Sequence, residues 1–303
     1  MINFKEQKAT LIESESALDM AEYAARLCYN SSKPQKADYD RIKFLKNLAS
    51  KGHLTPFEHG WLTIAIEIDG GAFAMSAKEF DLLSRMLGHP RDEVLVDGTL
   101  HTCTASLRTF IEVLGVDKAF EIFQKHDKRT EGWHTFEIIT SRAIGNQLSR
   151  HRSLSFENTW ELPEFAINQE SLRWVPQGEA SVCIGRGYKQ MLDENSGMKQ
   201  TWLHSINQSF EAYQQLCEQF KKEFARTVLP LCTTTRILMT GNTHTWAKFL
   251  ELRLGKTAEP QMQELAADIF FQIEKELMDE GTLPIDAAAS AVEYRERGKN
   301  SGS

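Results

Sequence analysis

The sequence predicts a helix-rich α+β fold with few strands. Most of its periodic stretches repeat apolar residues at every third or fourth position, which is the helical pattern. One stretch, Trp61–Ile68, alternates apolar and mixed residues instead, as a half-buried strand does. The chain has 303 residues, of which 41% are hydrophobic, so it can bury a substantial core. No composition shift marks a boundary, and we expect a single domain over residues 1–303.

The N-terminal part is expected to form two helices and a strand. Ser16 can cap a helix that runs to Tyr29, with apolar residues at helical spacing. Asp38 can cap a second helix, which Gly52 ends because glycine readily leaves the helical conformation. The alternating strand at Trp61–Ile68 follows after a short loop.

The rest of the chain is expected to be mostly helical. A short strand is predicted at Phe136–Ile139 and a loop at Glu157–Ile167. The polar tail, about residues 295–303, is expected to be disordered. Helices are predicted at Ser76–Gly88, Thr104–Leu114, Asp117–Phe123, Thr140–Arg150, Lys199–Arg226, Thr243–Leu254 and Glu259–Met278.

Composition excludes several classes of protein. The formal net charge of −7 disfavours a nucleic-acid polymer as the partner. No apolar run approaches the ~20 residues that span a bilayer, and no signal pattern is present, so we expect a cytoplasmic protein without a membrane partner. The five cysteines include no CxxC pair, which disfavours disulfides and thiolate zinc. His53 and His59 lack a third ligand at sensible spacing, so no metal is expected.

The triplet Arg150-His151-Arg152 carries the strongest chemical signal. Two guanidinium groups this close repel each other unless they face water or an anion. The planar fork of arginine suits phosphate, because it donates two parallel hydrogen bonds. Taken alone, the triplet is better explained as a solvated helix end, where such charges are common and cations also favour the helix dipole.

The surrounding sequence contains four ordered blocks: Ala25–Tyr29 with Gly52–His59, Gln147–Ser155 continued by Asn168–Trp174, Ala225–Pro230, and Thr235–Arg253. Together these blocks resemble flavin-dependent thymidylate synthases (ThyX type). Two departures stand out: Glu157–Ile167 interrupts the central motif, and Trp174 replaces its usual tyrosine. The stretch of about residues 70–135 is also much longer than its counterpart in compact members.

This resemblance implies a ThyX-like fold with a small, mostly antiparallel sheet and an inserted helical segment at about residues 70–135. It implies a homotetramer whose active sites lie at subunit interfaces. FAD would be the cofactor, a pyrimidine deoxynucleotide monophosphate the substrate, and NADPH and methylenetetrahydrofolate the cosubstrates. The reaction implied is the reductive methylation of dUMP to dTMP. The flavin carries the redox chemistry, and the protein orients and polarises the reactants.

The resemblance also assigns roles to individual residues. Catalytic roles fall to Arg253, which would face the pyrimidine ring, to His53 beside the flavin ring, and to Arg150. The residues implied for FAD are Thr55, Glu58, Arg150, His151, Arg152, Ser153 and Asn242, with His244 and Lys248 as further contacts. The residues implied for the nucleotide are Gln147, Gln169, Ser171, Leu172, Arg173, Arg226 and Arg253.

Three alternatives remain beside this reading. A relative could modify dCMP, or leave a hydroxymethyl group on carbon 5, and we expect the inserted stretch to cover or flank the site and influence that choice. A cysteine-dependent thymidylate synthase needs a nucleophilic thiol, and no cysteine here has the Pro-Cys-His setting. Cys28, where serine is usual near the flavin, is expected to be a buried core residue. An RNA-binding protein lacks support, because aromatic and basic residues are not interleaved.

Overall fold

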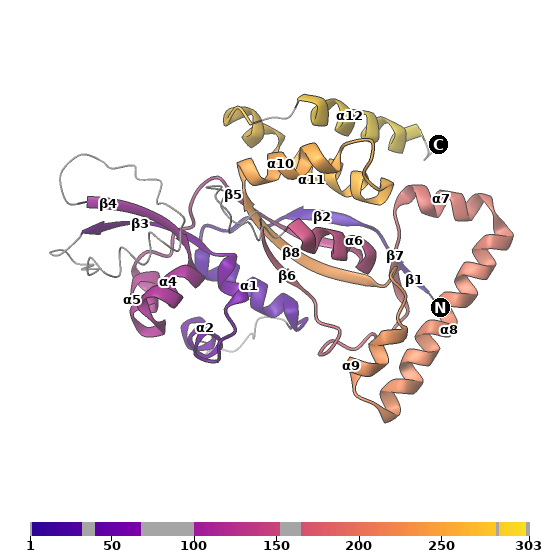
Figure 1. Ribbon diagram of the computed structural model, residues 1–303, viewed down its shortest axis with the longest axis horizontal. Helices are drawn as coiled ribbons and strands as arrows, with labels where there is room; N and C mark the ends of the chain where they lie inside the picture. The colour runs from indigo at the N-terminus through magenta and orange to yellow at the C-terminus, as the bar shows by residue number, and fades with distance from the viewer. Residues whose placement is uncertain (1, 32–39, 68–99, 152–164, 283–284, 301–303) are drawn as a thin grey trace.

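The computed structural model describes residues 2–31, 40–67, 100–151, 165–282 and 285–300. A four-stranded sheet in the order β2-β5-β8-β6 forms its centre, and all neighbours in it are antiparallel (Figure 1). Helices surround this sheet, which confirms the predicted helix-rich α+β class with a small, mostly antiparallel sheet. The four strands are β2 (Lys8–Leu11), β5 (Trp133–Ser141), β6 (Ala166–Gln169) and β8 (Thr234–Asn242).

Alternation along the central strands gives the sheet two apolar faces. On β8, Ile237 and Met239 join the largest core cluster, whereas Leu238 between them packs with Ala24 and Leu27 on the other side. Successive strand residues point to opposite faces, so a central strand covered on both faces reads as a nearly continuous apolar run. The sequence of β8 therefore lacked the simple alternation that marked the strand beginning at Trp61.

The largest core lies between the sheet and a set of helices. Figure 1 shows α10, α11 and α12 stacked on one side of the sheet, opposite α1. The ring of Trp246 is fully buried and meets Phe136 edge to face, with ring centroids 5.0 Å apart. Burying a side chain of this size contributes roughly 1.5–3 kcal/mol. The helices on this side are α6 (Arg142–Leu148), α10 (Thr243–Arg253), α11 (Pro260–Asp279) and α12 (Ile285–Asn300).

A second core cluster brings the N-terminal helices together with part of the predicted insertion. Phe110, Phe120 and Phe123 are fully buried there and meet edge to face. The elements involved are α1 (Ala17–Cys28), α2 (Arg41–Ser50), η1 (Thr55–Glu58), β3 (Trp61–Glu67), β4 (Leu100–Ser106), α4 (Leu107–Leu114) and α5 (Val116–Lys125). Strands β3 and β4 pair antiparallel as a separate sheet, so the segment is not purely helical as expected.

The remaining elements lie at the other end of the sheet. Strand β1 (Asn3–Lys5) pairs in parallel with β7 (Ser181–Cys183). The long helix expected over Lys199–Arg226 is broken, because Phe220 adopts an extended backbone conformation. Only the middle of its apolar stripe, at Ile206, Phe210 and Tyr213, is buried. The helices here are α7 (Arg186–Glu194), α8 (Ser196–Gln219), α9 (Lys222–Ala225) and η3 (Arg226–Val228).

Several predicted boundaries differ from the structure. Residues 104–106 end strand β4 rather than begin a helix, and residues 140–141 end β5. In both places a serine follows the strand run and caps the next helix: Ser106 accepts from the N–H of Thr109, and Ser141 from that of Ile144. Strand and helix abut without a loop at these serines, so no turn signal marks the change. Asp40 caps α2, since its Oδ1 accepts from the N–H of Lys43 at 3.0 Å, while Asp38, the predicted cap, lies outside the described residues.

Some expectations fall partly outside the described residues. The predicted helix at Ser76–Gly88 lies outside them, as does most of the predicted loop at Glu157–Ile167, whose last two residues begin β6. Helix α12 continues to Asn300, through most of the tail that was expected to be disordered. None of the helices in the described ranges combines the length and apolar composition needed to cross a bilayer.

Candidate active site

Arg253 and His151 are in direct contact. His151 ends the short helix η2 (Ser149–His151), and its buried ring lies edge to face with Phe249, with ring centroids 5.0 Å apart. Arg253, in the last turn of α10, donates from Nε to Nε2 of His151 at 2.8 Å. Burial, followed by the charge of Arg253, lowers the pKa of His151 to about 4. The imidazole is therefore neutral near pH 7 and accepts through Nε2.

Two further predicted residues lie on the same helical segment. Gln147, one turn before His151 on α6, donates from Nε2 to the Glu259 carboxylate at 2.5 Å. Glu259 stands directly before α11, so this bond fixes the amide between two helices. The side chain of Arg150 is exposed. Gln147, Arg150, His151 and Arg253 thus form one group, while the predicted Arg152 and Ser153 lie outside the described residues.

Gln169 lies beneath this group at the end of β6. Its Nε2 donates to Oγ1 of Thr235 on β8 at 3.0 Å. A Cβ at Gly145 of α6 would stand 3.0 Å from that same Nε2 and 2.9 Å from Cδ1 of Ile237. The lack of a side chain at Gly145 therefore lets α6 lie close to the strands, directly over Gln169.

A second group surrounds the turn after β6. The N–H of Ser171 donates to the carbonyl of Cys28 at 3.0 Å, which fastens the turn to the end of α1. The hydroxyl of Ser171 accepts from the N–H of Arg173 at 3.3 Å. Leu172 is half-buried, whereas Arg173 and, on η3, Arg226 have exposed side chains. Ser171, Leu172, Arg173 and Arg226 are all residues predicted to bind the nucleotide.

The third group lies at η1 and the adjoining end of the central sheet. His53 and Thr55 are exposed. Glu58 forms an ion pair of 2.5 Å with Arg108 of α4, so the predicted insertion contacts a predicted cofactor residue. Next to it, buried His59 shares a hydrogen bond of 2.8 Å between Nδ1 and Oγ1 of Thr240, which joins η1 to β8.

The start of α10 carries the remaining residues predicted for the cofactor. Asn242 caps this helix, its Oδ1 accepting from the N–H of Thr245 at 2.8 Å, and its amide group still has donors to offer. His244 and Lys248 are both exposed, one turn apart on the same face. A helix N-terminus favours an anion, and Lys248 adds a positive charge nearby, so contact with the pyrophosphate of a cofactor stays a prediction for these residues.

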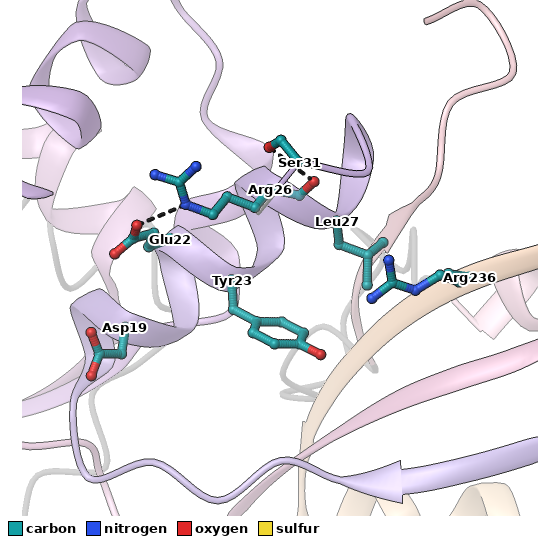
Figure 2. A pocket seen from close by; sticks show the side chains of 7 residues that line it. All are labelled: Asp19, Glu22, Tyr23, Arg26, Leu27, Ser31 and Arg236. Carbon is teal, nitrogen blue, oxygen red and sulfur yellow. Dashed lines mark hydrogen bonds and ion pairs between the residues drawn. The ribbon is translucent and has the colours of Figure 1, made fainter. Parts of the chain in front are cut away.

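A pocket of about 360 Å³ opens between α1 and β8, and its lining residues include none of the predicted ones. Figure 2 shows Tyr23 and Leu27 pointing from α1 toward Arg236 on the strand, and Arg26 turned along the helix toward Glu22. Its cations are already neutralised: Arg26 contacts Glu22 at 2.8 Å, and Arg236 contacts Glu137 at 2.9 Å. The pocket therefore has no surplus charge to attract an ionic ligand.

The sequence profile of one protein family, described as "Thymidylate synthase complementing protein", matches residues 10–75 and 130–277. These ranges contain more than half of the chain and include all three groups of residues. The chain belongs to this family.

Curated relatives in the thymidylate synthase complementing protein family are similar over a shorter stretch. A flavin-dependent thymidylate synthase of Synechocystis is 29% identical over 138 residues, which are 44% of this chain and 61% of that protein. A probable flavin-dependent thymidylate synthase of Paramecium bursaria Chlorella virus 1 is 32% identical over 139 residues, 44% of this chain and 62% of that protein. The chain thus spans about three fifths of the length of the relatives it matches.

A solved structure of a UMP/dUMP methylase, PolB from Streptomyces cacaoi, bound with 5-Br UMP, also resembles the chain. It is 15% identical, covers 96% of both chains, and has a TM-score of 0.44. A second structure of the same methylase, bound with 5-Br dUMP, is 16% identical with a TM-score of 0.43 and covers 90% of this chain and 93% of that one.

The profile of the thymidylate synthase complementing proteins leaves residues 76–129 unmatched. This part includes α4 and with it Arg108, the ion-pair partner of Glu58. Sequence reasoning missed Arg108, and also Glu259, which holds Gln147. Both contacts join elements that are distant along the chain, so no local pattern indicates them. Among the residues that the structure describes, no three histidine, cysteine, aspartate or glutamate side chains gather as metal ligands would.

Proposed function

We propose that the chain is a flavin-dependent thymidylate synthase that converts dUMP to dTMP. The observation that carries this proposal is the contact of 2.8 Å between Arg253 and His151, two residues that the family resemblance places at the pyrimidine and the flavin. Because Nε of Arg253 is held by His151, its terminal nitrogens are oriented and can donate to a ring carbonyl. Such a preorganised donor stabilises negative charge that develops on the ring, an effect worth roughly 2.7–4 kcal/mol in the transition state.

The reaction balances without an enzyme nucleophile. The methylene carbon of methylenetetrahydrofolate becomes the new methyl group on carbon 5 of the pyrimidine, and carbon 5 loses its proton. FAD, when bound, passes on the hydride that NADPH supplies. Tetrahydrofolate and NADP⁺ are released. Among the thiols, burial raises the pKa of Cys28 to about 11 and that of Cys232 to about 11, which keeps both protonated and inert near pH 7.

The arrangement of the predicted residues supports active sites at subunit interfaces. The described contacts place them in three groups: around Arg253, around Ser171, and around η1. The surface near Ser171 also exposes large aromatic rings, with Trp174 58% and Tyr29 45% exposed and their centroids 6.2 Å apart. Exposed aromatic patches are typical of surfaces that another molecule covers. We therefore propose a homotetramer in which neighbouring copies combine their groups.

The test is a direct assay. The purified protein is incubated with FAD, NADPH, methylenetetrahydrofolate and equal amounts of dUMP and dCMP, and the products are identified by mass spectrometry. We expect deoxythymidylate alone. A methylated or hydroxymethylated cytosine nucleotide would instead assign the chain to a related activity, and the absence of product despite bound FAD would refute the proposal. Light scattering of the same sample should give four times the mass of the chain.

A further inference from the structure

Arg142, the first residue of α6, is a partly buried arginine without a carboxylate hydrogen-bonded to it in the described part of the chain. Its Nη2 donates to the main-chain oxygen of Glu170 at 2.9 Å. Its Nε is fully enclosed and has no partner among the described residues. Burial accordingly lowers the pKa of Arg142 to about 10. An enclosed charge with so little compensation is costly to stability, so a reason other than stability is needed for its place.

Arg142 joins the two segments that carry the second group of predicted residues. Its backbone N–H donates to the carbonyl of Thr233 at 3.0 Å, which fastens the start of α6 to the segment after Arg226. Its side chain holds the carbonyl of Glu170, the residue directly before Ser171. The main chain of Arg142 is thus tied to one segment, and its side chain holds the other.

The charges around Arg142 leave a positive surplus. After burial, the charge of Glu170 has the larger effect and raises the pKa of Arg142, whereas the charge of Arg226 lowers it. The Glu170 carboxyl is itself buried, which raises its pKa, and it lies near Arg236 as well. Arg173 follows three residues after Glu170 with an exposed side chain. Neighbouring guanidinium groups repel each other, and a dianion placed among them relieves that repulsion.

We propose that Arg142 is a positioning residue for the phosphate of the bound nucleotide. It fixes the turn that carries Ser171 and Arg173, and it adds positive charge behind Arg226. The ligand class is a phosphate monoester, since a nucleoside without phosphate gains nothing from this charge. The inference rests on the proposed function, because it takes the residues of the second group as nucleotide ligands.

The test separates phosphate recognition from ring recognition. Isothermal titration calorimetry of the FAD-loaded protein measures Kd for dUMP and for deoxyuridine. Arg142→Gln removes the charge and should raise Kd for dUMP by roughly tenfold or more, the size expected for losing a charge-assisted interaction. Kd for deoxyuridine should stay within about twofold. Arg142→Lys keeps the charge without the fork, so its dUMP affinity should fall between Arg142→Gln and the wild type.

Arg129 provides a matched control at the opposite end of β5. It too has an enclosed Nε without a partner among the described residues, and burial lowers its pKa to about 10. Its Nη2 donates to Oγ1 of Thr135 at 2.6 Å, away from the Ser171 turn. Arg129→Gln should change thermal stability as Arg142→Gln does, while the ratio of the dUMP and deoxyuridine affinities stays at its wild-type value.

Each outcome decides one question. If Arg142→Gln weakens the binding of dUMP and deoxyuridine equally, or leaves both Kd values unchanged, the phosphate role of Arg142 is wrong. Binding of dUMP by the wild type would still support the proposed function. If the wild type fails to bind dUMP, the proposed function itself fails. Should Arg142→Gln not fold, Arg142→Lys decides: full wild-type affinity for dUMP would overturn the role of the guanidinium fork.

Discussion

The hydrogen bond from Nε of Arg253 to Nε2 of His151, 2.8 Å long, exists only while the imidazole is neutral. Protonation would turn the acceptor into a second donor facing a guanidinium group. Burial and the Arg253 charge accordingly lower the pKa of His151 from 6.5 to about 4. The pair thus couples the geometry of the proposed pyrimidine-facing arginine to pH.

This coupling predicts a loss of stability in mild acid. The unfolded chain takes up a proton at His151 near pH 6.5, and the folded chain only near pH 4. The contribution of neutral His151 to the free energy of unfolding is therefore fully present above about pH 6.5 and is lost as the pH falls toward 4. At pH 5 the free energy of unfolding should be lower by at most about 2 kcal/mol. His151→Gln keeps an acceptor for Arg253 but does not titrate. Urea unfolding at pH 7 and pH 5 should show that the free energy of unfolding falls less in His151→Gln than in the wild type. An equal fall in both proteins would contradict the lowered pKa of His151.

Replacing Arg253 tests the proposed chemistry. Arg253→Gln removes the positive charge at the ring, so kcat for dTMP formation should fall by about a hundredfold or more. Lys256→Gln, an exposed position three residues later, removes the same charge from the surface and serves as the control. Steady-state kinetics with dUMP should show a lower kcat for Arg253→Gln and a wild-type kcat for Lys256→Gln. Equal activity of both variants would exclude Arg253 from the reaction.

Arg108 tests whether the unmatched segment serves the cofactor. Its guanidinium bridges Glu58 on η1 and Glu112 on its own helix, at 2.5 and 2.9 Å. Arg108→Gln breaks both contacts and should weaken FAD binding several-fold, because the ion pair between Arg108 and Glu58 then no longer helps to orient Glu58. Glu112→Gln leaves the pair with Glu58 in place and should bind FAD as the wild type does. Flavin fluorescence titration measures the Kd for FAD of both variants. If Arg108→Gln binds FAD with the Kd of the wild type, α4 has no part in cofactor binding.

Cys28 distinguishes the proposed reaction from one that uses a thiol. Burial raises the pKa of this thiol to about 11, so it should react slowly with iodoacetamide at pH 7.5. Cys28→Ser should keep at least half of the wild-type kcat, since no thiolate is needed. A loss of more than a hundredfold, restored by no other small residue, would point to covalent catalysis through this cysteine.

The sequence predicted the parts of the fold whose signal is local. Helix α1 begins after Ser16 as expected, because Ser16 accepts from the N–H of Asp19 at 2.9 Å and a cap of this kind needs only neighbouring residues. Helices α10 and α11 also lie within a residue or so of their predicted ends. The central strand β8 was not predicted, since both of its faces are buried and its apolar run resembles a helix segment as much as a strand.

Contacts between distant segments could not be predicted in the same way. The residues Gln147 and Arg253 were identified because their blocks resemble those of flavin-dependent thymidylate synthases. Their structural partners, Glu259 and His151, depend on how α6 and α10 meet at the start of α11. Arg142 was overlooked because one arginine at a helix start looks like an ordinary surface residue. Its enclosure and the one hydrogen bond that its side chain makes within the described residues, to Glu170, set it apart.

Gly145 offers a test of how the core positions Gln169. A Cβ there would stand 2.9 Å from Cδ1 of Ile237 and 3.0 Å from Nε2 of Gln169, so both side chains must give way in Gly145→Ala. Ile237 is enclosed in the core, whereas Gln169 is only partly buried. We therefore expect the amide of Gln169 to leave Thr235. Alanine favours the helix by about 1 kcal/mol over glycine, which offsets part of the crowding, so thermal stability should change little.

If Gln169 contacts the nucleotide, its displacement should raise KM for dUMP several-fold with kcat largely kept. A double-mutant cycle decides whether Gly145 acts through Gln169. Gln169→Ala alone should raise KM to a similar degree, and adding Gly145→Ala to it should then raise KM no further, because no amide remains to be displaced. Additive effects on KM would mean that the methyl group disturbs α6 and Gln147 directly, and the close packing over Gln169 would have no part in binding.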